Sequence, residues 1–250
     1  MNAFLRIFFT ACVLTLTALT HACEGGDCAG TLAYQAYGSS EKPKAIVVFM
    51  HGAVSKGGPA DYMYRSARSF AESHPDIVAI ALLGPGYYDR HGKRSDGWDA
   101  QRRLADDTDP LIEALKALSV KYQTKKIFVL GHSKGAMNMG GILGKEPGLI
   151  SGAVLIAGIY DIDAIATSRN RSQNGISGIK LVSKIDKNTK IVLVHGDADH
   201  QVPIRQSEAF NQKAQEQGLS SQLIVLQGEG HDFGGVVSKT AIEQLEKLVD

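Results

Sequence analysis

The chain has 250 residues, of which 44% are hydrophobic and 21% are charged. This composition is ordinary for a globular enzyme, and the length is sufficient for one large α/β core. The formal net charge is +1, so no excess of positive charge favours nucleic acid or an anionic membrane surface as a partner.

The N-terminal end has the pattern of a secretory signal peptide. Arg6 supplies positive charge, and Ile7–Leu19 is apolar apart from threonines. Thr20 and Ala22 put small residues at the two positions that a signal peptidase reads. The apolar stretch is too short to span a bilayer comfortably, which disfavours an uncleaved anchor. We therefore predict an exported protein, periplasmic or secreted, that loses residues 1–22 and has no stable membrane insertion afterwards.

Two of the three cysteines lie outside this predicted signal. Cys12 falls within it, whereas Cys23 and Cys28 remain in the chain after cleavage. In an exported protein, two cysteines so close in sequence can form a small disulfide loop. The alternative is a lipoprotein anchored through Cys23. Thr20 stands where such bacterial signals usually carry leucine, so we favour the unlipidated form.

Beyond residue 30, short apolar runs alternate with helical patterns. Thr31–Tyr37 alternates in polarity and predicts an antiparallel edge strand. Later runs are nearly continuous in hydrophobicity, which is typical of strands covered on both faces: Ala45–Met50, Ile77–Leu83, Lys126–Leu130, Ala153–Ala157, Lys190–Val194 and Gln222–Leu226. Helical patterns lie between them: Asp61–Ser73, Asp106–Lys121, Lys134–Leu143, Pro203–Gln217 and Val236–Leu248. This order predicts a doubly wound, mostly parallel sheet in a single domain. Only Ile159–Thr189 is expected to be irregular, and it is too short for a lid domain.

The strongest chemical signal is the pentapeptide G-H-S-K-G at residues 131–135, which directly follows an apolar strand and begins a helical pattern. In that context G-x-S-x-G is a nucleophile elbow, whose serine sits on a strained turn at the end of the sheet. Gly131 and Gly135 flank the turn because a Cβ atom there would collide with neighbouring backbone. We therefore predict that Ser133 is a nucleophile. The alternative is an ordinary serine in a glycine-rich turn.

The loop after the Lys190–Val194 strand offers two aspartates, Asp197 and Asp199. The acid of a catalytic triad accepts a hydrogen bond from the imidazole and fixes its tautomer. The pattern H-G-x-x-D-x-x-V-P, which starts at His195, resembles the acid loop of the α/β-hydrolase family. That resemblance implies that Asp199 is the acid and that Asp197 is a turn residue or helix cap. Asp161 is a weaker alternative, because some relatives place the acid after the preceding strand.

The resemblance covers roughly residues 31–248. It points to small esterases and lipases, dienelactone hydrolases or prolyl-oligopeptidase-like catalytic domains without a large lid. It implies the α/β-hydrolase fold for a catalytic domain at residues 23–250. The sequence contains no H-E-x-x-H, C-x-x-C or P-loop pattern, so we expect no metal and no cofactor. This fold orders its triad as serine, acid, histidine. His231, on the glycine-rich loop after the last strand, is therefore the predicted general base, although a loop histidine taken alone is usually just solvated.

An oxyanion hole needs two backbone donors. One is the N–H of Lys134, the residue after the nucleophile. The other is implied by the sequence F-M-H-G-A at residues 49–53, which resembles the H-G loop of the family and points to Ala53. In this interpretation His51 braces the loop and transfers no proton.

The loop after the next strand resembles the P-G-Y turn of the family, which is mainly scaffold. Its basic residues, between Arg90 and Arg94, are more simply a solvated loop than the mouth of a site. Trp98, Tyr87 and Tyr88 are candidates for an acyl pocket, and equally for core or loop packing.

These residues predict a serine hydrolase that cleaves a carboxylic ester or thioester of a small molecule through an acyl-enzyme. One alternative is a serine peptidase on the same triad, which would act on small or exposed peptides because a chain of this length has no room for a propeller. Another is a binding protein that keeps the fold without turnover. The intact set of serine, aspartate, histidine and H-G loop argues against that last alternative.

Overall fold

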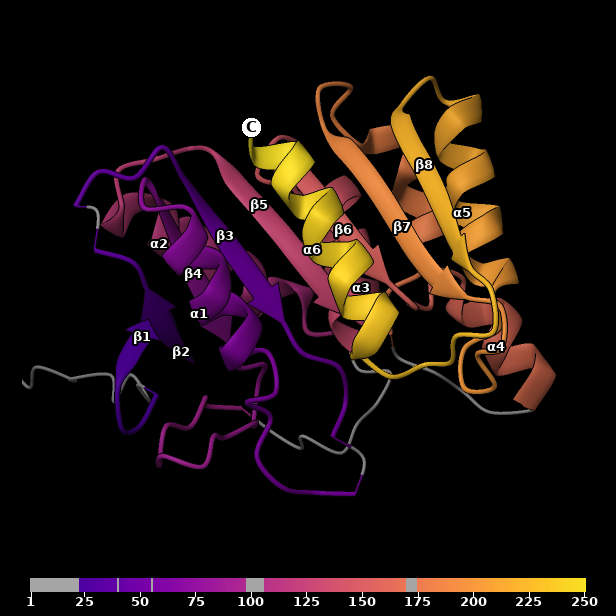
Figure 1. Ribbon diagram of the computed structural model, residues 1–250. Helices are drawn as coiled ribbons and strands as arrows, with labels where there is room; N and C mark the ends of the chain where they lie inside the picture. The colour runs from indigo at the N-terminus through magenta and orange to yellow at the C-terminus, as the bar shows by residue number, and fades with distance from the viewer. Residues whose placement is uncertain (1–22, 40, 55, 98–105, 170–174) are drawn as a thin grey trace, which may run out of the picture.

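A computed structural model describes residues 23–39, 41–54, 56–97, 106–169 and 175–250 (Figure 1). The signal peptide predicted at residues 1–22 and the candidate pocket residue Trp98 lie outside the described residues. The described chain forms one eight-stranded sheet with helices packed on both faces. The predicted fold class, a doubly wound and mostly parallel sheet in a single domain, is confirmed.

The sheet has the strand order β1-β2-β4-β3-β5-β6-β7-β8. The strands are β1 Asp27–Ala29, β2 Leu32–Tyr37, β3 Ala45–Met50, β4 Ile77–Leu82, β5 Ile127–His132, β6 Gly152–Ile156, β7 Lys190–Gly196 and β8 Ser220–Leu226. Strands β3 to β8 pair in parallel, whereas β2 is antiparallel to β4 and β1 is antiparallel to β2. The expected antiparallel strand therefore exists, but β1 covers its outer side. β1 was not predicted, because three residues are too few to show a periodic pattern.

Two hydrophobic layers fill the space between the sheet and its helices. Helices α1 (Tyr64–Ser73) and α6 (Gly235–Val249) cover one face, which is turned to the viewer in Figure 1. Helices α2 (Thr108–Lys121), α3 (Lys134–Lys145) and α5 (Arg205–Glu216) cover the other. Burial of the central strands on both faces explains why their sequences are continuously apolar.

The stretch expected to be irregular contains two short elements, α4 (Ile162–Arg169) and the 3-10 helix η1 (Gly178–Lys184). Ile162 and Ile165 pack with Val202 in a small separate cluster. Each element is so short that only a few apolar positions repeat, and tertiary contacts rather than periodicity stabilise it.

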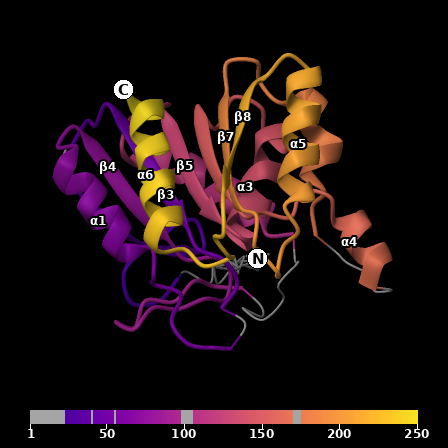
Figure 2. The ribbon, with the colours of Figure 1, turned by 45° about the vertical axis from the view of Figure 1, so that its right-hand side comes forward.

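The carboxyl ends of the parallel strands meet at one edge of the sheet, and the loops after β3 and β4 gather below that edge in Figure 2. Loops at this edge are where open α/β sheets place their ligand sites.

At the N-terminal side, Cys23 and Cys28 form a disulfide with a Cα–Cα distance of 5.8 Å. None of the helices in the described ranges has the length and apolar character that a bilayer crossing requires.

Candidate active site

Ser133 lies in the sharp turn between β5 and α3. Its φ of 55° and ψ of −116° are unusual for a residue with a side chain. The turn can close because the residues two positions before and after Ser133 are glycines. A Cβ atom on Gly131 would lie 2.8 Å from the backbone nitrogen of Ala136, and one on Gly135 would lie 2.5 Å from the carbonyl oxygen of Met50. The strand–turn–helix geometry that the pentapeptide predicts is therefore present.

His231 lies between Ser133 and Asp199 and is hydrogen-bonded to both. Its Nε2 lies 2.9 Å from the Oγ of Ser133, and its Nδ1 lies 2.7 Å from the Oδ2 of Asp199. The three side chains come from the loops that follow β8, β5 and β7, at the same edge of the sheet. With Nδ1–H donating to the carboxylate, Nε2 carries no proton and can accept a hydrogen bond from the hydroxyl of Ser133.

The carboxylate of Asp199 is buried, and both of its oxygens have polar partners. Its Oδ1 accepts hydrogen bonds from the backbone N–H groups of Gln201 and Val202, at 2.8 and 2.9 Å. Its Oδ2 also lies 3.3 Å from the Nε2 of a second histidine, His195. Burial acts to raise the pKa of Asp199, but hydrogen bonds from His195, His231 and Val202 hold it well below its ordinary value. The residue is therefore an anion that favours a positive charge on His231.

The two alternative acids have other partners. The Oδ1 of Asp197 accepts a hydrogen bond of 2.7 Å from the backbone N–H of Gly228, which ties the loop after β7 to the loop after β8. The Oδ1 of Asp161 accepts one of 3.1 Å from the N–H of Ala164 in the first turn of α4. Of the three aspartates considered, Asp199 is the one in contact with His231.

The loop that carries Ala53 packs directly against the serine turn. A Cβ atom on Gly52 would lie 2.9 Å from the Cβ of Ser133, so the two backbones are in close contact. Lys134 is the first residue of α3, and N–H groups at a helix N-terminus point outward along its axis. The side chain of Lys134 is buried and forms an ion pair of 2.7 Å with Asp107. Lys134 and Ala53 thus lie on the two backbone segments that border Ser133.

His51 joins the Ala53 loop to the loop after β4. Its Nδ1–H donates to the carbonyl of Gly52 at 2.7 Å, and its Nε2 accepts from the N–H of Gly84 at 2.9 Å. Burial lowers the pKa of His51 to about 4, so the ring is neutral. Both nitrogens are occupied by backbone groups, which agrees with the bracing role expected from the sequence.

The aromatic and basic candidates after β4 pack against the protein. Tyr87 is buried, and its ring centroid lies 4.5 Å from that of His51. Tyr88 is exposed at the surface. Arg90 forms a two-pronged ion pair with Asp61 at 2.7 and 2.9 Å. These contacts favour core packing for Tyr87 and loop packing for Arg90.

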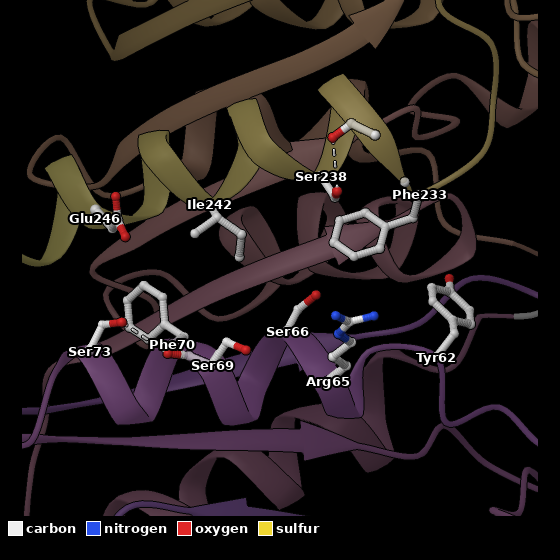
Figure 3. A pocket seen from close by; sticks show the side chains of 12 residues that line it. Tyr62, Arg65, Ser66, Ser69, Phe70, Ser73, Phe233, Ser238, Ile242 and Glu246 are labelled. Carbon is white, nitrogen blue, oxygen red and sulfur yellow. Dashed lines mark hydrogen bonds between the residues drawn. The ribbon is translucent and has the colours of Figure 1, made fainter.

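A pocket of about 470 Å³ lies beside the site, between α1 and α6. Figure 3 shows Tyr62 and Phe233 at one end of it, with Ser73 and Glu246 at the other. Ser133 does not line it. The pocket therefore extends away from Ser133 along the face covered by α1 and α6, and its Tyr62 end lies nearest the site.

Three further residues touch the site and were not singled out from the sequence. His195 lies against Asp199. His132 and Tyr62 are hydrogen-bonded to each other, with the hydroxyl oxygen of Tyr62 2.7 Å from the Nδ1 of His132. His132 and His195 stand inside the recognised motifs and could have been found there, whereas Tyr62 belongs to no motif.

The fold and the hydrogen-bonded serine, histidine and aspartate define the α/β-hydrolase class. The family model described as the prolyl oligopeptidase family, Peptidase_S9, matches residues 99–250, which is more than half of the chain. The chain belongs to this family. The resemblance to α/β-hydrolase serine hydrolases is thereby confirmed. A search of curated proteins gave no match.

Solved structures with the same fold include both esterases and peptidases. Esterase PE8 is 22% identical with a TM-score of 0.63, over 87% of this chain and 99% of that protein. A monoacylglycerol lipase from Paleococcus ferrophilus is 16% identical with a TM-score of 0.63, over 87% and 98%. Dipeptidyl peptidase 4 from Porphyromonas gingivalis is 12% identical with a TM-score of 0.65, over 87% of this chain but 33% of the peptidase. At these identities the likeness establishes the fold alone.

Proposed function

We propose that this protein is a serine hydrolase that cleaves a carboxylic ester or thioester through an acyl-enzyme. Ser133 is the nucleophile, His231 the general base and Asp199 the residue that orients the histidine. The observation that carries the proposal is the continuous hydrogen bonding from Ser133 Oγ to His231 Nε2 and from His231 Nδ1 to Asp199 Oδ2, at 2.9 and 2.7 Å.

The chemistry follows from this arrangement. Ser133 Oγ attacks the acyl carbon while His231 Nε2 takes its proton, and the anion of Asp199 stabilises the imidazolium. The N–H groups of Lys134 and Ala53 stabilise the negative oxygen of the tetrahedral intermediate. His231 then returns the proton to the departing alcohol or thiol. Water repeats the attack on the acyl-enzyme, with His231 again as base, and releases the carboxylic acid and free Ser133. No cofactor takes part in these steps.

A peptidase on the same triad is the second candidate, favoured by the family match and by the fold shared with dipeptidyl peptidase 4. We favour esters because an alkoxide or thiolate is a better leaving group than an amine, and because the acyl-enzyme chemistry requires nothing more than the residues named. The same triad on a peptide would need a further set of groups to hold the chain.

The test is to label the purified protein with a fluorophosphonate probe and then compare two substrate series. One series is of nitrophenyl esters of increasing acyl length, and the other is of short peptide anilides. Labelling with hydrolysis of esters alone supports the proposal. Hydrolysis of an anilide with comparable kcat/KM would establish the peptidase. A protein that is folded but neither labelled nor active would support the non-catalytic binding protein.

We also propose export to the periplasm or the cell exterior, with a substrate met there. The disulfide between Cys23 and Cys28 supports this, since such bonds persist in oxidising compartments. Fractionation of cells that express the full chain tests the location. Recovery of the folded protein in the cytoplasm with its N-terminus intact would contradict it.

A further inference from the structure

Tyr62 lies in the loop between β3 and α1 and reaches the site with its hydroxyl group. More than a third of the residue is exposed, and its ring borders the pocket in Figure 3. The hydroxyl points inward: the backbone nitrogen of Gly52 lies 2.5 Å from it, and the Nδ1 of His132 lies 2.7 Å from it. The other ring nitrogen of His132, Nε2, lies 2.7 Å from the carbonyl oxygen of His231.

The direction of each hydrogen bond follows from its two ends. The N–H of Gly52 can only donate, so the oxygen of Tyr62 accepts there. The carbonyl of His231 can only accept, so Nε2 of His132 carries a proton and donates it. Burial lowers the pKa of His132 to about 4, so the ring is neutral and its Nδ1 is free of a proton. Tyr62 O–H therefore donates to Nδ1. One unbroken chain of hydrogen bonds runs from the N–H of Gly52 through Tyr62 and His132 to the carbonyl of His231.

Apart from Tyr62 itself, every member of this chain of hydrogen bonds is, or directly precedes, a residue of the proposed mechanism. Gly52 precedes Ala53, which carries a proposed oxyanion donor. His132 precedes the nucleophile, and the carbonyl at the far end belongs to the proposed base itself. Gly52 is also packed against the nucleophile, because a Cβ atom on it would lie 2.9 Å from the Cβ of Ser133. A small displacement of the Gly52 backbone would therefore also displace Ser133.

Contacts between aromatic rings support this chain of hydrogen bonds. The ring centroid of Phe233 lies 6.2 Å from that of Tyr62 and 5.9 Å from that of His132. The ring of His132 lies 5.1 Å from that of His231. These ring contacts favour one orientation of each ring, which helps the hydrogen bonds to keep one geometry.

We propose that Tyr62, acting through His132, is a positioning residue that holds the Ala53 loop and the His231 loop at a fixed separation across Ser133. This rests on the proposed function, since it assigns a role within the same triad. Loss of the hydroxyl leaves the ring of Tyr62 in place but loosens the proposed oxyanion donor relative to the proposed base. The effect falls on the transition state, so kcat changes and KM does not.

Tyr62→Phe removes the hydroxyl alone and is the first variant. Its matched control is Tyr64→Phe, which removes a hydroxyl that donates to Asp89 at 2.9 Å, away from the site. Rates on a nitrophenyl ester are divided by the concentration of sites that react with a fluorophosphonate, so that unfolded protein does not count. We expect kcat of Tyr62→Phe to fall about tenfold to a hundredfold, with KM within about twofold. Tyr64→Phe should keep the wild-type kcat.

His132→Asn breaks the same chain at its second link and is measured alongside. An asparagine can still accept from Tyr62, but it is too short to reach the carbonyl of His231. If the chain acts as one unit, the double variant should lose little more than the worse single variant. If the fold-losses in kcat of the two single variants instead multiply in the double variant, their free energies add and the two residues act independently. That result would overturn the continuous chain of hydrogen bonds.

Two outcomes separate this inference from the function on which it rests. A wild-type protein that is labelled and active, with a Tyr62→Phe variant whose kcat per labelled site is unchanged, would overturn the positioning role alone. A folded wild type that is not labelled and hydrolyses no ester or anilide would overturn the proposed function, and the positioning role with it. If Tyr62→Phe does not fold, His132→Asn decides by the same ratio of kcat to labelled sites.

Discussion

Asp197 and Asp199 stand two residues apart on the loop after β7 and bind different groups of the loop after β8. Asp199 Oδ2 lies 2.7 Å from Nδ1 of His231, whereas Asp197 Oδ1 accepts from the backbone N–H of Gly228 at 2.7 Å. Asp199 is buried and Asp197 is exposed. The same functional group therefore contacts the proposed base in one case and joins two loops in the other.

This difference predicts unequal effects of the same substitution. Asp199→Asn should lower kcat by about 10⁴-fold, because an amide neither fixes the tautomer of His231 nor stabilises the imidazolium. Asp197→Asn keeps an oxygen that can accept from Gly228, so kcat should change by less than about threefold. Steady-state kinetics on one ester measures both. Comparable losses in the two variants, or the larger loss in Asp197→Asn, would contradict the assignment of the acid.

Ser133→Ala tests the nucleophile. Alanine can occupy the same turn, so the variant should unfold at a temperature close to that of the wild type. Fluorophosphonate labelling should vanish, and kcat should fall by about 10⁴-fold or more because the triad acts as a unit. Labelling of the variant at the wild-type rate would place the reactive serine elsewhere. Circular dichroism supplies the control for folding.

The sequence predicted most of this architecture because its longer helices show a period and its central strands are continuously apolar. The parallel strands were visible as apolar runs, and the elbow was visible because its glycines and serine are adjacent in sequence. β1, α4 and η1 were missed because each is short and depends on contacts from elsewhere. Tyr62 was missed for a related reason: nothing local distinguishes it, and its role follows from a 2.7 Å contact with His132, 70 residues away.

Gly52→Ala tests the close contact between the Ala53 loop and the serine turn. The new methyl group would lie 2.9 Å from the Cβ of Ser133 and 3.2 Å from the carbonyl of His132. One backbone must move, so we expect a loss of about 1–3 kcal/mol in the free energy of unfolding and a larger proportional loss in kcat. Gly234→Ala is the control, because an added Cβ there meets no heavy atom within 4 Å. A fully active Gly52→Ala would show that the contact is not tight.

Mass spectrometry of the protein recovered from the host exterior or periplasm tests the N-terminal predictions. We expect the mature chain to begin at Cys23 and to weigh two hydrogens less than its reduced form, because Cys23 and Cys28 are joined. Reduction followed by alkylation should add two labels. A mass increment of the size of a diacylglycerol on Cys23 would establish the lipoprotein instead, and a chain that still contains Arg6 would exclude cleavage.

His51 predicts how stability depends on pH. Burial lowers its pKa to about 4 in the folded protein, against about 6.5 in an unfolded chain. Between these two values the unfolded chain binds a proton at this residue and the folded chain does not. The stabilising contribution is therefore complete above about pH 6.5 and is lost progressively as the pH falls toward 4, by up to about 1.4 kcal/mol per pH unit. His132, with a pKa lowered to about 4 by burial, acts in the same direction.

His51→Gln removes this titration and keeps an amide that can accept from the N–H of Gly84. The variant should be less stable than the wild type at pH 7, because the bond from the ring to Gly52 is lost, but its stability should fall less steeply below pH 6.5. Urea unfolding at intervals from pH 4.5 to 7 measures the two slopes. His200→Gln, at a solvent-exposed histidine, is the control and should keep the wild-type slope. The carboxylate of Asp199 does not interfere, because its low pKa makes its contribution change only below about pH 4. Equal slopes for wild type and His51→Gln would mean that His51 takes up its proton over the same pH range in the folded and unfolded states, and its role as a neutral brace between Gly52 and Gly84 would have to be abandoned.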